Sequence, residues 1–107
     1  MDHGHAKSDA RNLWLHRAAL RNLAAHPTLR QRCLASLERW LTNPAFRSSR
    51  PHLEEWKEML LYWSDAAISA VILDDEKGQT LRQCSPLAPT LTVAERWHLL
   101  AELRRDA

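Results

Sequence analysis

The sequence predicts an all-α protein, a compact single-domain bundle of five or six short helices. Only 2 of its 107 residues are Gly, whereas 45% are hydrophobic, and most of these are Leu and Ala. The scarcity of Gly argues against a β-sandwich or barrel, which needs turn residues every several positions. Leu, Ala, Arg and Glu favour helix because their side chains lose little rotamer freedom there. We expect one domain over residues 8–107, after a disordered N-terminal tail of residues 1–7.

Two helices are expected in the first part of the chain. Ser8 is a suitable N-cap for the first helix, which runs to about Ala25 and ends because Pro27 pushes the preceding residue out of the helical region. Pro27 begins the second helix, which runs to about Leu41. Its apolar side chains recur at spacings of three and four, as in a helix with one buried face. They are Leu29, Cys33, Leu37 and Trp40, with Leu34 and Leu41 beside them.

A loop and a third helix are expected next. Residues 43–50 (NPAFRSSR) are rich in turn-forming residues, and Phe46 is predicted to lie against the core. Pro51 suits the first turn of a helix, where its missing N–H would have no partner in any case. The apolar spacing predicts the buried face of this helix, formed by Leu53, Trp56, Leu60 and Trp63.

Two shorter helices should follow. Ser64 can cap the first of them, which runs through Leu73. Because this run is apolar almost all round, we expect it to be the central and most buried element. A strand is disfavoured there, since no second strand would pair with it. Residues 74–76 (Asp, Asp, Glu) form an acidic start, favoured by the helix dipole, for a short helix to about Gln83.

The last part of the chain combines an extended connection with a final helix. Residues 84–91 (CSPLAPTL) hold two prolines, and two roles stay open for them. They form either an internal strap pinned to the core by Leu87 and Leu91, or a rigid contact loop that loses little entropy on binding. Thr92 and Glu95 form a capping box that opens the final helix. The side chains predicted to point inward from it are Val93, Trp97, Leu100 and Leu103.

The cysteines and the N-terminus indicate a cytoplasmic protein. Cys33 and Cys84 form neither a CxxC pair nor a spaced framework, and no apolar segment of the kind found in signal peptides follows Met1. The longest apolar run, residues 66–73, is far shorter than the ~20 residues that a membrane span needs. We therefore expect reduced thiols and no membrane partner.

No catalytic, metal or cofactor site is expected. Among the six histidines, His16 lies in an apolar stripe and is predicted to be buried and hydrogen-bonded. His98 precedes Glu102 by four residues, a spacing typical of a surface ion pair rather than of a zinc site. The sequence contains neither a nucleophile motif nor a Gly-rich phosphate loop. The chain is therefore not expected to be an enzyme or to take a small-molecule substrate.

Arginine beside tryptophan is the feature that points to a partner. Twelve of the 15 basic residues are Arg, the cation that stacks on aromatic rings and pairs with carboxylate or phosphate through two N–H groups. Trp14, Arg17 and Arg21 are spaced at three and four on the first helix and share one face. Arg30, Arg32 and Arg39 on the second helix are expected to extend this surface, and Arg32 and Arg39 lie on one side of that helix. Trp14 is the expected exposed anchor, since apolar stripes explain the other tryptophans as core residues.

This arginine face has three open interpretations. It binds an acidic protein, binds a nucleic acid, or is a solvated face whose charges pair within the chain. Residues 1–50 hold nine Lys or Arg against three acids, and residues 51–107 hold six against ten. The asymmetry indicates either a basic face for an acidic partner or two halves that attract each other within one fold.

The C-terminal segment carries a family pattern of Leu-Arg-Gln, Ser-Pro, Leu and Glu-Arg-Trp. The matching positions are Leu81, Arg82, Gln83, Ser85, Pro86, Leu91, Glu95, Arg96 and Trp97. In this the chain resembles the tail of a family of short helical bacterial proteins, although Leu87 replaces an aromatic residue and residues 88–89 replace Gly. Members of that family sit beside nucleotidyltransferase-like toxins in toxin–antitoxin or defence loci. The resemblance therefore implies a partner-binding role and no catalytic residue.

We predict a partner-binding, antitoxin-like protein that neutralises or regulates a cognate bacterial enzyme through protein–protein contact. The predicted contact residues are Trp14, Arg17, Arg21, Arg82, Ser85, Pro86 and Arg96. The alternative is a nucleic-acid-binding regulator that uses the Arg-rich face of the first two helices.

Overall fold

The computed structural model describes residues 3–74 and 76–106, which form six α-helices and two short 3-10 helices. The elements are α1 (His3–Ala25), α2 (Thr28–Leu41), η1 (Pro44–Ser49), α3 (Arg50–Tyr62), α4 (Asp65–Ile72), α5 (Lys77–Gln83), η2 (Ala88–Thr90) and α6 (Val93–Asp106). No strand occurs among the described residues, so the predicted all-α fold is confirmed.

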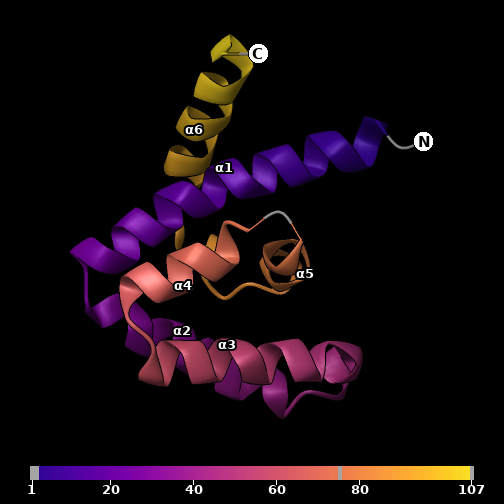
Figure 1. The fold of residues 1–107 in the computed structure, drawn as a ribbon, viewed down its shortest axis with the longest axis vertical. Helices are drawn as coiled ribbons and strands as arrows, with labels where there is room; N and C mark the ends of the chain where they lie inside the picture. The colour runs from indigo at the N-terminus through magenta and orange to yellow at the C-terminus, as the bar shows by residue number, and fades with distance from the viewer. Residues whose placement is uncertain (1–2, 75, 107) are drawn as a thin grey trace.

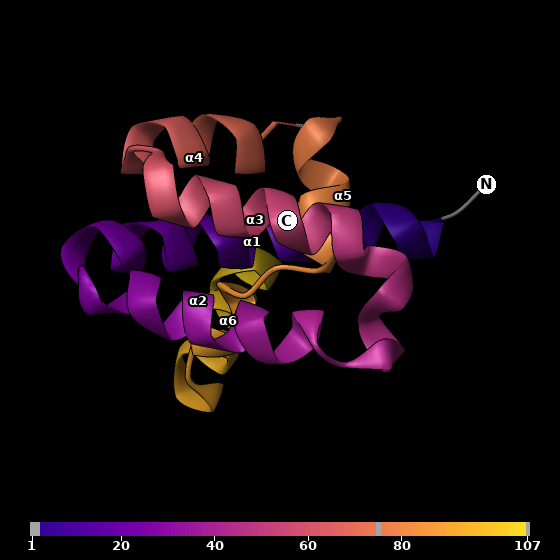
Figure 2. The same ribbon diagram turned by 90° about the horizontal axis from the view of Figure 1, so that it is seen from below.

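The helices are stacked in layers (Figure 1). The α2 and α3 helices lie side by side, α5 contacts both α3 and α1, α4 packs on α1 and α5, and α6 crosses α1 on its far side. Seen from below, the α2–α3 pair lies in front of α1, with α4 along one edge (Figure 2). The last helix is therefore an outer element, whereas α3 lies among several neighbours.

The core takes side chains from α1 to α5 and from the connection between α5 and α6. At its centre Trp56 has no exposed surface, and its indole N–H donates a hydrogen bond of 2.8 Å to the carbonyl oxygen of Leu81. Leu53 and Leu60 are buried beside it as predicted, but Trp63 at the end of the same stripe is 39% exposed. From α6, only the half-buried Leu99 packs against this core among the described residues.

The α4 helix is not the central element that its composition predicts. Ser64 caps it as expected, since its hydroxyl oxygen accepts a backbone N–H bond of 3.1 Å. Ile68 and Ile72 are fully buried, but Ala66 and Ala70 are exposed on the outer side. Alanine is an apolar residue, but its single methyl group has so little surface that exposing it to water costs little free energy. An apolar run containing several alanines can therefore still form an outer helix.

The first helix begins earlier than predicted. It starts at His3, so Ser8 lies within the helix and is not its N-cap. Gly4 is the weakest helix former before Ser8, and one Gly costs only about 1 kcal/mol. The predicted tail of residues 1–7 is thus helical from His3, and residues 1–2 of it lie outside the described residues.

Residues 44–49 form η1 rather than an irregular loop. The side-chain oxygen of Asn43 accepts the backbone N–H of Ala45 at 3.0 Å, which closes a tight turn after α2. Phe46 then stacks on Trp40, with ring centroids 5.5 Å apart, and both rings are half-buried against the core. The predicted position of Phe46 is confirmed.

The connection between α5 and α6 is an internal strap. Leu87 has no exposed surface and Leu91 has 5%, so both side chains belong to the core. The strap ends at the predicted capping box, in which the Glu95 N–H donates to the Thr92 hydroxyl at 3.0 Å and the Thr92 N–H donates to the Glu95 carboxylate at 2.8 Å. The burial of Leu87 and Leu91 supports the internal-strap interpretation, while Pro89 of the same segment is exposed.

Candidate protein-binding surface

The apolar face of α6 is left largely uncovered. Val93 is 72% exposed and Trp97 is 65% exposed, whereas Leu100 and Leu103 are half-buried. Spacings of four and three place these residues on one face of the helix. The prediction that Val93 and Trp97 point inward is wrong, because α6 reaches the core through Leu99 instead. The stripe exists, but this chain provides little to cover it.

The position of α6 follows from how its first turn is held. The Arg96 guanidinium donates a hydrogen bond of 2.8 Å to the carbonyl oxygen of Ala88 in the strap. The Asn22 side-chain amide of α1 donates a hydrogen bond of 3.3 Å to the Glu95 carboxylate. These contacts tie the start of α6 to the body, while its C-terminal end projects beyond α1 (Figure 1).

A hollow lies between α1 and the projecting part of α6. It is lined by Arg11, Trp97, Leu100, Leu103 and Arg104. The two arginines are exposed, and the ion pairs among the described residues involve other arginines. The hollow therefore has an apolar floor and a positively charged rim.

Trp14, which was predicted to be an exposed anchor, is instead half-buried. Its indole N–H is buried without a hydrogen-bond acceptor among the described protein atoms. The most exposed tryptophan with an assigned exposure is Trp97, not Trp14. Arg17 and Arg21 are exposed on α1 as predicted. The misassignment of Trp97 has a physical origin, since its spacing showed an apolar face but not whether another element packs there.

Arg82 is a correction to the predicted contact set. Only 2% of its surface is exposed, and its guanidinium donates to the carbonyl oxygens of Ile72 at 2.7 Å and Asp74 at 3.2 Å. Its other terminal nitrogen forms an ion pair of 2.9 Å with the Asp9 carboxylate of α1. The side chain joins α1, α4 and α5 inside the molecule, so it is out of reach of a partner.

Ser85 and Pro86 are also corrections. Ser85 is 6% exposed and its hydroxyl accepts the backbone N–H of Leu87 at 2.9 Å, whereas Pro86 is fully buried. The Pro86 carbonyl oxygen accepts a contact of 3.5 Å from the Cys33 thiol. These residues stabilise the strap from within, and Arg96 is half-buried against the same strap.

The arginines of α2 remain on the surface. Arg32 and Arg39 are exposed and line a hollow between α2 and the strap. There the Arg39 guanidinium donates a hydrogen bond of 3.1 Å to the Ser36 hydroxyl. The chain does pair some charges between its two halves, as in the Arg30–Asp65 ion pair of 2.7 Å. The ion pairs found among the described residues leave Arg32 and Arg39 out.

His16 is buried and hydrogen-bonded, as predicted. Its Nδ1–H donates a hydrogen bond of 2.8 Å to the carbonyl oxygen of Asn12, and Nε2 is buried without a hydrogen-bond partner among the described protein atoms. The pKa of His16 is lowered to about 4, chiefly by burial and to a smaller extent by the positive charges of Arg82 and Arg96, while the hydrogen bond to Asn12 opposes the shift. The imidazole is therefore neutral at pH 7 and belongs to the interior.

Other candidate groups have structural roles. His98 and Glu102 form the predicted exposed pair at 3.1 Å. Burial raises the pKa of the Cys33 thiol to about 11, so it carries almost no thiolate at neutral pH. Within residues 3–74 and 76–106, no group of three or more His, Cys, Asp or Glu side chains is arranged to hold a metal ion.

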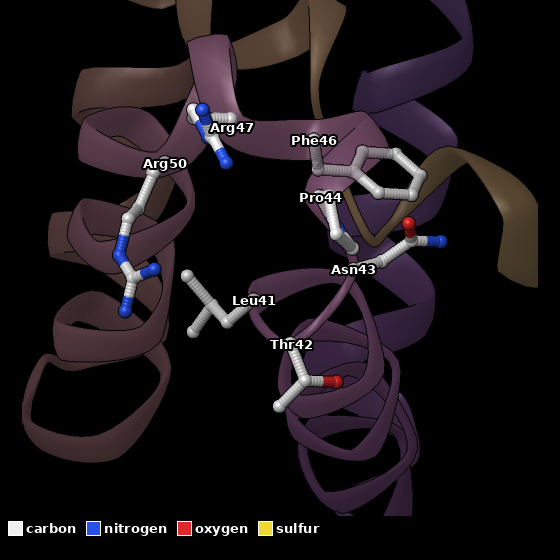
Figure 3. A pocket seen from close by; sticks show the side chains of 7 residues that line it. All are labelled: Leu41, Thr42, Asn43, Pro44, Phe46, Arg47 and Arg50. Atoms are coloured by element: carbon white, nitrogen blue, oxygen red, sulfur yellow. The ribbon is translucent and has the colours of Figure 1, made fainter.

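A further hollow lies where α2 ends and η1 meets α3 (Figure 3). Arg47 and Arg50 line one side of it, opposite Leu41 and Thr42 at the end of α2. Arg50 already pairs with Glu54 at 3.2 Å, and the last carbonyls of α2 carry partial negative charge that opposes a bound anion. The hollow between α1 and α6 is the better candidate for a binding site. It exposes the large apolar side chain of Trp97, and its two arginines are outside the ion pairs found among the described residues.

The fold and this surface define a helical protein with an apolar, basic-rimmed outer face. Among its described residues, no helix combines the length and apolar character that crossing a membrane requires. Comparisons with protein-family models, with curated proteins and with solved structures found no match to the chain.

Proposed function

We propose that this protein acts by binding another protein through the exposed face of α6 and the adjoining part of α1. The observation that carries the proposal is Trp97, a large aromatic side chain left 65% exposed on a helix whose apolar stripe is largely uncovered. Tryptophan and arginine are the residues most often found at the energetic centres of protein interfaces. Here Trp97 lines one hollow together with Arg11 and Arg104.

The partner in this proposal is an enzyme that the protein neutralises or regulates, in the manner of an antitoxin. Support for that role comes from the resemblance of residues 81–103 to the tail of proteins encoded beside nucleotidyltransferase-like toxins. The buried residues of that pattern hold the strap and α6 in place. Gln83 and Trp97 are the exposed members of the pattern, and Trp97 is the one that lines the hollow between α1 and α6.

The test is purification of the tagged protein from its native host. Wild-type protein should recover one stoichiometric protein partner, and Trp97→Ala should lose it because the variant removes the apolar centre of the surface. Tyr62→Ala is the matched control, since Tyr62 is an aromatic residue that is 79% exposed on α3. Recovery of the wild-type protein alone, or equal recovery with Trp97→Ala, contradicts the proposal.

Nucleic-acid binding is the second candidate function. It is favoured by four exposed arginines that are outside the ion pairs found among the described residues: Arg17, Arg21, Arg32 and Arg39. A complex through several phosphates weakens steeply as salt rises, because counterions are no longer released with the same gain. If the protein shows no mobility shift with DNA or RNA even at low salt, this candidate fails.

A further inference from the structure

The hollow between α1 and α6 has the shape and charge of a site for one particular kind of segment. Val93, Trp97, Leu100 and Leu103 run along α6 over about 15 Å, or roughly three helical turns. Ala94 and Ala101 are exposed on the same helix, where their small side chains let a second backbone approach closely. A straight apolar stripe of this length matches the apolar face of another α-helix.

The charge around the stripe restricts what that helix can be. Arg11 of α1 and Arg104 of α6 line the hollow, and Arg105 is exposed next to Arg104. The half-buried Glu102 of α6 already pairs with His98. An incoming segment with carboxylates beside its apolar face would gain charge-assisted hydrogen bonds from the rim.

A second copy of this chain fits the hollow poorly. A symmetric dimer through this surface would bring the rim arginines of the two copies together, and like charges facing each other oppose association. The chain as a whole also carries a net charge of +2. The occupant should therefore be a different chain with an acidic character.

We propose that the hollow between α1 and α6 receives an acidic amphipathic α-helix of a partner protein. Apolar side chains of this helix, spaced at three and four, cover Trp97 and Leu100, and its flanking Asp or Glu side chains pair with Arg11 and Arg104. The inference rests on the proposed function, because it names the segment by which the partner binds.

The test uses a phage-displayed library of random peptides long enough for about four helical turns. The full-length protein is the bait, and the Trp97→Ala protein serves for counter-selection. Recovered peptides should carry apolar residues at helical spacing and a net negative charge, and should become helical on binding. A library that yields no Trp97-dependent peptide, or peptides without acidic bias, overturns the inference.

Affinity of a recovered peptide is then measured by fluorescence anisotropy against matched variants. Trp97→Ala should weaken binding about thirtyfold, as expected for a central hot-spot residue. Reversing both rim charges, Arg11→Glu with Arg104→Glu, should weaken it about tenfold, and the effect should shrink as salt is raised. The control pair Arg39→Glu with Arg47→Glu changes the net charge equally at exposed positions away from the hollow. Equal weakening by both pairs overturns the specific role of the rim.

These outcomes are separable from those of the proposed function. If the host partner is captured through Trp97 but is insensitive to the Arg11 and Arg104 reversals, the proposed function stands and the acidic-helix inference fails. If the host yields no partner while acidic helical peptides bind in a Trp97-dependent way, the preference of the hollow for an acidic helix stands and the proposed function fails. Circular dichroism of each variant establishes that the fold is retained.

Discussion

The two tryptophans at the centre of α3 and near the start of α6 lie in similar sequence patterns and opposite surroundings. Trp56 follows Leu53 by three residues, and Trp97 follows Val93 by four. Trp56 has no exposed surface and its N–H is hydrogen-bonded to the body, whereas Trp97 is 65% exposed. An apolar stripe is therefore necessary for burial but not sufficient.

The difference comes from the path of the chain around each helix. The α3 helix contacts α2, η1 and α5, so its apolar face meets side chains from several elements. The α6 helix comes last, after a strap that fills the space beside α1 and α2, and it packs chiefly on α1. The region with many neighbours buries its apolar stripe in the core, and the region with few neighbours leaves its stripe largely uncovered.

The largest expected effect is that of Trp56→Ala on stability. The substitution leaves a cavity at the centre of the core and removes the hydrogen-bond donor of the Leu81 carbonyl oxygen. The free energy of unfolding should fall by about 3–5 kcal/mol. Urea unfolding followed by far-UV circular dichroism measures this loss. A loss below about 1 kcal/mol would mean that α3 is not the centre of the core.

The second prediction concerns acid and the body around α1. The pKa of His16 is lowered to about 4 in the folded protein, against an ordinary value of 6.5 in the unfolded chain. Below pH 6.5 the unfolded chain therefore binds a proton that the folded protein does not, and stability falls until about pH 4. The loss should reach about 2 kcal/mol at pH 5 and about 3 kcal/mol at pH 4.

Urea unfolding at pH 7 and pH 5 measures this dependence. His16→Leu should flatten it because the titrating group is gone, while His98→Ala should retain it because His98 is exposed in its pair with Glu102. If the His16→Leu protein loses as much stability as the wild type between these two pH values, the assignment to His16 is wrong.

Local patterns predicted the parts of the fold that local contacts make. The capping box of Thr92 and Glu95 and the Ser64 cap were both predicted from nearby residues. Each depends on groups within a few positions of one another, so spacing and residue type carry the needed information.

The candidate site depended on contacts between distant parts of the chain, and spacing could not show these. Arg82 looked like a surface cation, but Asp9, 73 residues away, and two carbonyl groups near the end of α4 accept hydrogen bonds from its two terminal nitrogens in the interior. Trp97 looked like a core residue because its helix has an apolar face. Which side of α6 meets the body depends on how the strap and α1 are placed, and helical periodicity does not contain that information.

A smaller effect is expected when the N-caps of α6 and α4 are removed in turn, and it should differ between the two helices. Thr92→Ala removes the hydroxyl that accepts the Glu95 N–H, at a cost of about 1 kcal/mol. Because α6 has few core contacts, we expect this cost to appear as local opening, with amide hydrogen exchange in α6 about fivefold faster and core amides unchanged. Ser64→Ala is the matched control, since α4 buries Ile68 and Ile72 and its cap should affect the core amides. Faster exchange throughout the core of Thr92→Ala would show that α6 unfolds together with the body.

The smallest expected effect is that of Trp97→Ala on the isolated protein. The substitution deletes the same side chain as Trp56→Ala, but Trp97 is already 65% exposed, so folding gains little from it. The free energy of unfolding should change by no more than about 0.5 kcal/mol, while partner binding is lost. Urea unfolding of the two alanine variants side by side measures the contrast. A loss above about 2 kcal/mol in Trp97→Ala would mean that the indole stabilises the folded chain itself, and a side chain required for folding would no longer be evidence for a docking surface.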